Sequence, residues 1–505
     1  MRDPQVALVY LSNRRVAYSS IAFHMIRGYL AESGVPHAVY FLEEGSLTSE
    51  RPAPPPSKAP VWLVSLPYEI LYADLVRALE ASGVPLLRER RRGSPLVVAG
   101  GPAVTANPLP LFDIADAFLI GELEPVFDDL LEAFQAGSPG ARLQEVAGVR
   151  GVLAPSMPRR VRRVYQPDLD ASWYPVEQRV PRGVEPVWGR SYMLETTRGC
   201  ARMCRFCMEG VIFRPKRDRS YARLRELFEE GVEASGVGKV SFYSLAFFDS
   251  PHAEKILAYA VERGYEVSVP SLRAETITRE RARLIAMGGQ RTITIAPETG
   301  SCRLGRAINK CIGVEGTLRA VEEALEGGIR NVKLYLIVGF PGETEEDLRE
   351  TLNLVRIVAR IVARRGRTLR VSVNPFIPKP ATPLQWAPLP DKRYVAEASM
   401  RIAREARMYG GRATTYDFKW ALVQAVLSRG GERLGRAIIA WAHRGARLGA
   451  FRGALREVGV EASSYTEEWP LDYTPPWHDY IEHPYASLRT LRLEYEAYLR
   501  VAKSR

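Results

Sequence analysis

The residues best able to do chemistry are the cysteines, because three of the five crowd into one short segment. Cys200, Cys204 and Cys207 are separated by three and by two residues, whereas Cys302 and Cys311 lie further along the chain. A disulfide framework spreads its cysteines through the sequence, so this crowding indicates a metal site in a reducing compartment.

The spacing of the three cysteines favours an iron–sulfur cluster. Thiolates are the preferred ligands of such clusters, and one short loop can reach three iron corners. Three ligands leave a fourth iron open to bind a substrate or cofactor. A structural zinc site requires a fourth Cys or His nearby, and the first histidine after this loop, His252, lies far downstream.

The segment Cys200-Ala-Arg-Met-Cys204-Arg-Phe-Cys207 resembles the signature of the radical S-adenosylmethionine (SAM) superfamily. The resemblance implies a [4Fe-4S] cluster whose open iron chelates the amino and carboxylate groups of SAM. It also implies reductive cleavage of SAM to methionine and a 5′-deoxyadenosyl radical, with electrons from a donor such as flavodoxin or ferredoxin. Phe206 is then expected near the adenine.

Further segments resemble the same superfamily at the ends of expected strands. Ala296–Ser301 is similar to its "PE-x-GS" segment, which implies that Glu298 contacts the ribose or amino group of SAM. Arg303 could hold a carboxylate, and a salt-bridge role is equally compatible with its position. Leu336–Thr344 is similar to the segment that packs the adenine, with Ile337 as the apolar contact. Tyr243, Ser244 and Arg273 occupy positions where the superfamily holds SAM, although the usual glycine-rich second-strand motif is absent.

The elements that must position these residues form a repeated strand–helix pattern in residues 191–400. Six strand–helix repeats predict a partial (β/α)6 barrel of the TIM type, in which the residues after the strands meet at one mouth. Thr344 and Asp347 predict a capped helix after the fifth strand. The expected strands are Tyr192–Thr196, Lys239–Ser244, Glu266–Pro270, Thr292–Ala296, Val332–Val338 and Arg370–Pro375.

Residues 1–150 alternate short apolar strands with helices, which predicts a Rossmann-like, doubly wound parallel sheet. Pro95–Pro102, Asn107-Pro108 and Ile120–Glu122 resemble the cobalamin-binding domain that precedes many radical SAM barrels. That resemblance implies cobalamin as a further cofactor. However, the D-x-H-x-x-G segment that ligates cobalt is missing, and His24 fits a packed or surface position, so a degenerate domain without cobalamin stays open.

The remaining regions are a proline-rich linker, residues 151–190, and a mostly helical C-terminal region, residues 401–505. Asn374–Trp386, Val426–Gly430 and Pro476–His478 resemble an uncharacterised radical SAM subfamily. Where Ala381 stands here, that subfamily usually has a histidine. The subfamily brings no established substrate.

Composition sets the broad class of the protein. The chain has 505 residues, of which 46% are hydrophobic and 25% charged, as in globular proteins. No apolar run is long enough to span a bilayer, and no signal peptide is evident, so we expect a cytoplasmic protein. The net charge of +12 is compatible with a nucleic-acid partner, and an arginine-rich solvated surface is the favoured explanation.

Three functional hypotheses follow from these features. The first is cobalamin-assisted methyl transfer, a transferase reaction, or related C–H functionalisation. The second is cobalamin-free hydrogen abstraction from a nucleotide, RNA, lipid or peptide. The third is a binding or maturation protein that keeps the cluster without turnover. Neither the N-terminal domain nor the region after Cys311 has cysteines for a second cluster, so all three hypotheses involve a single cluster.

Overall fold

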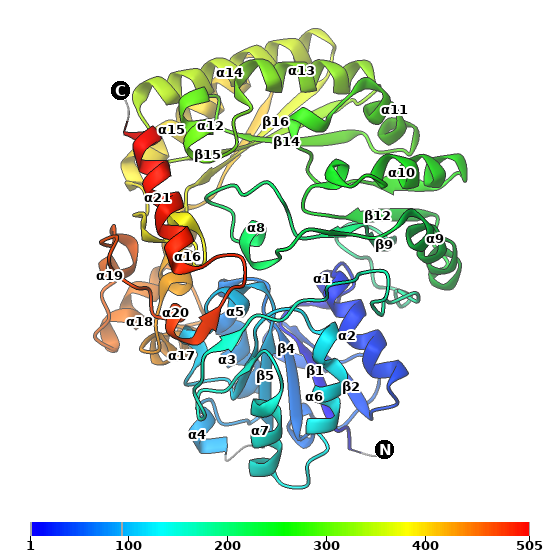
Figure 1. Ribbon diagram of the computed structural model, residues 1–505, viewed down its shortest axis with the longest axis vertical. Helices are drawn as coiled ribbons and strands as arrows, with labels where there is room; N and C mark the ends of the chain where they lie inside the picture. The colour runs from blue at the N-terminus through cyan, green and yellow to red at the C-terminus, as the bar shows by residue number, and fades with distance from the viewer. Residues whose placement is uncertain (1–2, 92–93, 504–505) are drawn as a thin grey trace. The chain divides into compact units, whose positions relative to one another are not determined.

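The computed structural model describes residues 3–91 and 94–503, and the chain divides into two compact units (Figure 1). Unit 1 comprises residues 1–190, 423–466 and 472–488, and unit 2 comprises residues 191–422, 467–471 and 489–505. Residues 1–2, 92–93 and 504–505, which fall in the expected N-terminal and C-terminal regions, lie outside the described residues.

Unit 1 is built on a mixed sheet whose central strands are parallel, which confirms the expected α/β class. The order is β3-β2-β1-β4-β5-β6-β7, with antiparallel pairing only of β3 and β7 at the edges. The central strands are apolar and mostly buried on both faces, as helix-covered parallel strands are. The strands are β1 (Val6–Tyr10), β2 (His37–Glu43), β3 (Ser46–Ser49), β4 (Val61–Ser65), β5 (Leu96–Gly100), β6 (Ala117–Leu119) and β7 (Val152–Leu153).

The helices of unit 1 come from two distant parts of the sequence. The N-terminal part supplies α1 (Arg14–Ala17), α2 (Ile21–Glu32), α3 (Tyr72–Ala81), α4 (Arg88–Arg91), α5 (Pro102–Ala106), α6 (Phe127–Ala133) and α7 (Pro139–Gly148). The C-terminal part supplies the end of α16 (Phe418–Arg429), α17 (Leu434–His443), α18 (Phe451–Glu457), α19 (Ser463–Thr466) and α20 (Trp477–Tyr480). Helix α17 packs against α3.

The segments expected as a linker and as a C-terminal region take part in unit 1. Strand β8 (Val161–Arg162) pairs with β18 (Ile481–Glu482). The buried Asn107 side-chain amide donates to the carbonyl oxygens of Ser428 and Gly430 at 2.9 and 2.8 Å. The first segment of unit 1 ends at residue 190, as expected for the start of the barrel, but neither unit ends at residue 150 or 400. The functional division of the chain at these residues stays a prediction.

Unit 2 contains all six strands expected for residues 191–400. One sheet has the order β13-β12-β9 and the other β14-β15-β16-β17, every neighbouring pair is parallel, and a parallel bridge joins Leu272 to Ile295. The strands are β9 (Tyr192–Glu195), β12 (Lys239–Tyr243), β13 (Glu266–Ser268), β14 (Thr292–Glu298), β15 (Asn331–Val338), β16 (Thr368–Pro375) and β17 (Arg412–Thr415). The sequence did not predict β17, because its residues are polar and it lies at the sheet edge.

Helices cover the outer face of these strands (Figure 1). They are α9 (Tyr221–Ser235), α10 (Ala253–Glu262), α11 (Arg279–Met287), α13 (Gly313–Glu326), α14 (Glu345–Arg364) and α15 (Lys392–Arg407); α8 (Glu209–Ile212), α12 (Cys302–Ala307) and α21 (Leu488–Ala502) complete the unit. Thr344 and Asp347 form the capping box expected at the start of α14.

The strands β15 and β16 alternate strictly between buried residues and residues that keep some exposure. The buried set packs under the helices, so the other set defines the inner face of the sheet. None of the described helices is both long and apolar enough to cross a membrane.

Candidate functional site

The three-cysteine loop begins where β9 ends and is shaped by two residues with positive φ. Gly199 has φ of 81°, and a Cβ atom there would lie 2.4 Å from the carbonyl oxygen of Phe213 and 2.5 Å from that of Pro215. Met203 adopts φ of 57° between the first two cysteines. The short hairpin of β10 (Thr197–Arg198) with β11 (Arg217–Asp218) closes the loop at its base. A tight, glycine-dependent turn therefore presents the thiols.

Each of the three thiols accepts a hydrogen bond from the surrounding protein. The N–H of Arg202 lies 3.5 Å from the Cys200 Sγ, and the N–H of Gly210 lies 3.3 Å from the Cys207 Sγ. The guanidinium of Arg273 lies 3.7 Å from the Cys204 Sγ. Hydrogen bonds to sulfur are one of the means by which proteins stabilise and tune iron–sulfur clusters. This donor set fits a cluster held by three thiolates.

Burial works against ionisation of two of these thiols. It raises the pKa of Cys207 to about 12, and it raises the pKa of Cys204 although Lys310 and Arg273 act in the opposite direction. A thiolate at either position therefore needs a compensating positive charge, which cluster iron provides.

The described residues do not gather three His, Cys, Asp or Glu side chains around one metal ion. In a [4Fe-4S] cluster each cysteine binds a different iron, so the Sγ atoms need not converge on one point. Cys302 and Cys311 are exposed and separate from the three-cysteine loop in sequence.

The loop rests on the turn that follows α12. The guanidinium of Arg205 donates to the carbonyl oxygen of Ala307 at 2.6 Å, and its backbone N–H donates to that of Ile308 at 3.0 Å. The amide of Asn309 donates to the carbonyl oxygens of Arg202 and Met203 at 3.3 and 3.1 Å. The sequence did not single out Asn309, because its role depends on contacts between segments distant in the chain.

The predicted SAM residue Glu298 lies at the end of β14, buried and with φ of 68°. Its Oε1 accepts a hydrogen bond of 2.7 Å from the Nζ of Lys310, which is also buried. Lys310 is the second residue that the sequence missed. It ties the end of β14 to the turn that supports the cysteine loop.

The guanidinium of Arg303 is occupied by the protein itself. It pairs with Asp347 and donates to the carbonyl oxygens of Gly342 and Ala502. Asp347 also accepts a bond of 2.5 Å from the Ser301 hydroxyl. Of the two roles that the sequence allowed for Arg303, the structure places its side chain in the salt bridge.

The remaining predicted contacts lie around the same strand ends. The ring of Phe206 meets that of Phe340 edge-on at 5.7 Å, and Phe340 packs on Phe376 at 5.3 Å. Ile337 lies on the inner face of β15. Tyr243 ends β12, and the Ser244 hydroxyl lies 2.6 Å from that of Thr197.

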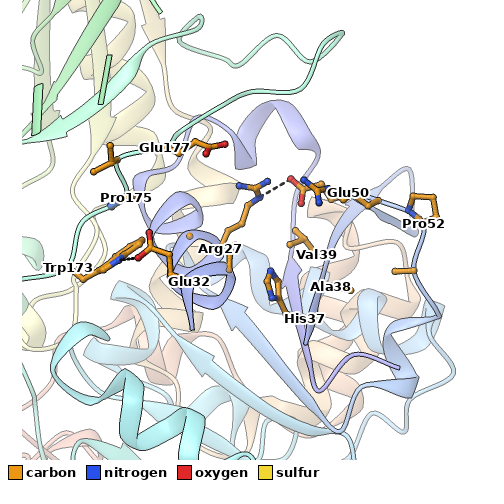
Figure 2. Close-up of a pocket in the computed structure, with 15 residues that line it drawn as sticks. Arg27, Glu32, His37, Ala38, Val39, Glu50, Pro52, Trp173, Pro175 and Glu177 are labelled. Carbon is orange, nitrogen blue, oxygen red and sulfur yellow. Dashed lines mark hydrogen bonds and ion pairs between the residues drawn. The ribbon is translucent and has the colours of Figure 1, made fainter. Parts of the chain in front are cut away.

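Two cavities lined by described residues of unit 1 lie at different ends of its sheet. One, of about 690 Å³, lies where β1 and β2 end and is lined in part by Ser12, Asn13 and Glu43. The other, of about 530 Å³, lies near His37 at the start of β2; Figure 2 shows Arg27 paired with Glu50 there and Trp173 bonded to Glu32. Ligands of doubly wound sheets bind outside the carboxyl ends of strands, so of these two cavities the first has the expected location.

Among the described residues, no histidine lines the cavity at the carboxyl ends of this sheet. Asn13 caps α1, and His24 is buried with its pKa lowered by burial to about 4. A Cβ atom on Gly101 would lie 2.8 Å from the Leu66 carbonyl oxygen, and one on Gly121 would lie 2.0 Å from that of Val164. The lack of a side chain at these two glycines therefore makes room for backbone atoms of the chain itself, those of Leu66 and Val164.

Comparison with known proteins supports the sequence-based resemblance. The family description "Radical SAM superfamily" matches residues 194–355, and "Radical SAM proteins, N-terminal" matches residues 41–155. An uncharacterised protein of Methanocaldococcus jannaschii, MJ0966, is 30% identical over 437 residues, which cover 85% of this chain and 90% of the relative.

Two further matches are more distant. The tRNA-2-methylthio-N(6)-dimethylallyladenosine synthase of Tropheryma whipplei is 30% identical over 203 residues, which cover 37% of this chain and 42% of that enzyme. The radical SAM methyltransferase TsrM of Kitasatospora setae, solved with cobalamin and a [4Fe-4S] cluster, shares the fold at a TM-score of 0.51 and 18% identity, over 74% of this chain and 72% of TsrM. Together with the site, the extended match to MJ0966 places this chain in the radical SAM superfamily, whose domain implies a [4Fe-4S] cluster and SAM as cofactors.

Proposed function

We propose that this protein cleaves SAM reductively to begin radical C–H chemistry, with the cluster bound by Cys200, Cys204 and Cys207. The observation that carries the proposal is the three-cysteine loop, in which each thiol accepts a hydrogen bond from the surrounding protein. When bound, a [4Fe-4S] cluster with an open iron supplies the electron for cleavage of SAM. A reducing compartment suits such a cluster, so we propose a cytoplasmic enzyme with flavodoxin or ferredoxin as electron donor.

The side chains around the loop would bind and orient SAM. Glu298 would accept hydrogen bonds from its ribose or amino group, while its Oε1 also accepts the hydrogen bond from Lys310. Phe206 and Ile337 would provide apolar contacts for the adenine and exclude water from it. Tyr243 and Ser244 would line the same site from β12.

Arg273 and Arg303 would differ in their roles. Arg273 places positive charge beside the Cys204 Sγ and also pairs with Glu275, so it would stabilise the thiolate and remain close to bound SAM. Arg303 would act as a positioning residue, because its bonds to Asp347 join α12 to the start of α14.

The proposal is tested by anaerobic reconstitution with iron and sulfide, followed by incubation with SAM and dithionite. We expect 5′-deoxyadenosine from the wild-type chain and none from Cys204→Ala. When dithionite is omitted, we expect 5′-deoxyadenosine to form only if reduced flavodoxin or ferredoxin is supplied. If neither 5′-deoxyadenosine nor S-adenosylhomocysteine forms, the protein binds a cluster without SAM turnover and the proposal is wrong.

A second candidate, cobalamin-assisted methyl transfer, is favoured by the sheet order of unit 1 and by the cavity of about 690 Å³ at the ends of β1 and β2. TsrM, of similar fold, was solved with cobalamin. No histidine lines this cavity among the described residues, and we assign no step to cobalamin. Incubation with hydroxocobalamin, gel filtration and a visible spectrum decide the matter: retention of one equivalent favours methyl transfer, and its loss favours cobalamin-free hydrogen abstraction.

A further inference from the structure

Three basic residues lie side by side on the inner face of the sheet in unit 2. Parallel pairing sets Lys333 of β15 opposite Arg370 of β16, and Arg370 opposite Arg412 of β17. Adjacent strands are about 4.8 Å apart, so the three side chains begin within about 10 Å of one another. We call these three residues the basic row.

The alternation of burial places the basic row on the accessible face. In β16 the neighbours Leu369 and Val371 are buried, whereas Arg370 is exposed. In β15 Val332 and Leu334 are buried, whereas Lys333 is partly exposed. The charged groups therefore point away from the helices that cover the outer face.

Within the described part of the chain, no carboxylate neutralises the basic row. The Nζ of Lys333 bonds to the Tyr335 hydroxyl at 3.2 Å and lies 4.7 Å from the centre of its ring. Arg370 and Arg412 form no ion pair or side-chain hydrogen bond among the described residues. Like charges directly opposite one another in a sheet are destabilising, so this arrangement costs stability unless an anion binds.

Edge protection explains only part of the row. Charged residues commonly protect edge strands from pairing with other chains, and β17 lies at the edge of its sheet. Arg370, however, belongs to β16, which has a partner on each side, and Lys333 belongs to β15, which is also internal. Two of the three charges therefore need another explanation.

We propose that the basic row binds the phosphate groups of the substrate. A phosphate monoester carries about −1.5 to −2 charge, so a diphosphate, or neighbouring phosphates of a nucleic acid, would neutralise three cations better than a single phosphate. The hydroxyls of Thr294 and Ser372 lie on the same face, opposite Lys333 and beside Arg370 in register order. The ligand chemistry is therefore that of adjacent phosphates.

The position of the basic row sets the distance between the phosphates of the substrate and its reactive carbon. Ile337, proposed to contact the adenine of SAM, lies on the same face of β15, four residues after Lys333. That separation is about 13 Å along the strand. The reactive carbon of the substrate would lie a comparable distance from its phosphates. This inference rests on the proposed function, because it assigns the anion to the substrate of that reaction.

The test measures binding without turnover, so its outcome is independent of SAM cleavage. Full-length, cluster-reconstituted protein is titrated with pyrophosphate at constant ionic strength, and the Kd and Tm are recorded. We expect pyrophosphate to raise Tm and Arg370→Gln to weaken binding about tenfold. Lys333→Gln should act in the same direction. Arg360→Gln, an exposed change on α14, is the matched control and should bind like the wild type.

A second arm uses a short single-stranded RNA in place of pyrophosphate. Binding of pyrophosphate that depends on Arg370 identifies a free diphosphate as the source, and binding of RNA alone with the same dependence identifies a nucleic acid. Without any anion, Arg370→Gln should raise Tm because it removes like-charge repulsion. Equal affinities of Arg370→Gln and Arg360→Gln for both probes would overturn the proposal, even if 5′-deoxyadenosine is formed normally.

Discussion

The Nζ of Lys310 donates a 2.7 Å hydrogen bond to the Oε1 of Glu298, and both side chains are less than one-tenth exposed. This pair connects the end of β14 to the turn that supports the cysteine loop. Removal of one partner would leave the other charge buried without compensation. We therefore expect Lys310→Met to lower the free energy of unfolding by about 3–5 kcal/mol.

Denaturant unfolding of the apoprotein checks this expectation. The double variant Glu298→Gln/Lys310→Met removes both charges and should recover most of the lost stability. If the double variant is as unstable as Lys310→Met alone, the pair is not what stabilises this region.

The five cysteines allow the proposed cluster ligands to be compared with other cysteines of the same chain. Cys200, Cys204 and Cys207 lie in the loop, whereas Cys302 and Cys311 are exposed elsewhere. Alanine at any loop position should abolish the iron-dependent absorption of the reconstituted protein, while Cys302→Ser and Cys311→Ser should keep the wild-type iron content. Iron content unchanged in Cys204→Ala would rule out the assigned ligands.

Substitution of Asn107 tests the contact between the N-terminal and C-terminal segments of unit 1. Its buried amide donates to the carbonyl oxygens of Ser428 and Gly430, and Asn107→Ala leaves both acceptors without this partner. We expect a loss of about 2 kcal/mol in the free energy of unfolding. Asn353→Ala, an exposed change on α14, should alter stability by less than about 0.5 kcal/mol; a similar loss in both variants would contradict the role of Asn107.

Titration of Glu343 should make the free energy of unfolding depend on pH in a defined direction. Burial raises the pKa of its carboxyl to about 7, although the N–H of Gly339 donates to it. Because the folded-state pKa lies above the unfolded value, its contribution to stability is full below about pH 4.5 and is lost as the pH rises through about 7. Glu343→Gln should flatten this part of the stability profile, measured by denaturation at constant salt. A profile identical to that of the wild type would show that Glu343 does not titrate there.

Local sequence patterns predicted the parts of the site that depend on neighbours in the chain. The six strands of residues 191–400, the cap formed by Thr344 and the three-cysteine loop all follow from short-range spacing. Lys310 and Asn309 were missed because their partners lie on other segments, and no local pattern identifies such contacts. For the same reason, the sequence left two roles open for Arg303.

The discontinuous composition of unit 1 has a consequence for how the protein is made. Its first 190 residues leave the ribosome long before residues 423–488, which supply the acceptors of Asn107 and the helix that packs on α3. Residues 191–422 of unit 2 are synthesised in between, whereas its residues 489–505 follow the last segment of unit 1. Domains usually fold from the N-terminus during synthesis; here part of the surface of the N-terminal sheet stays uncovered until residues 423–488 have been synthesised.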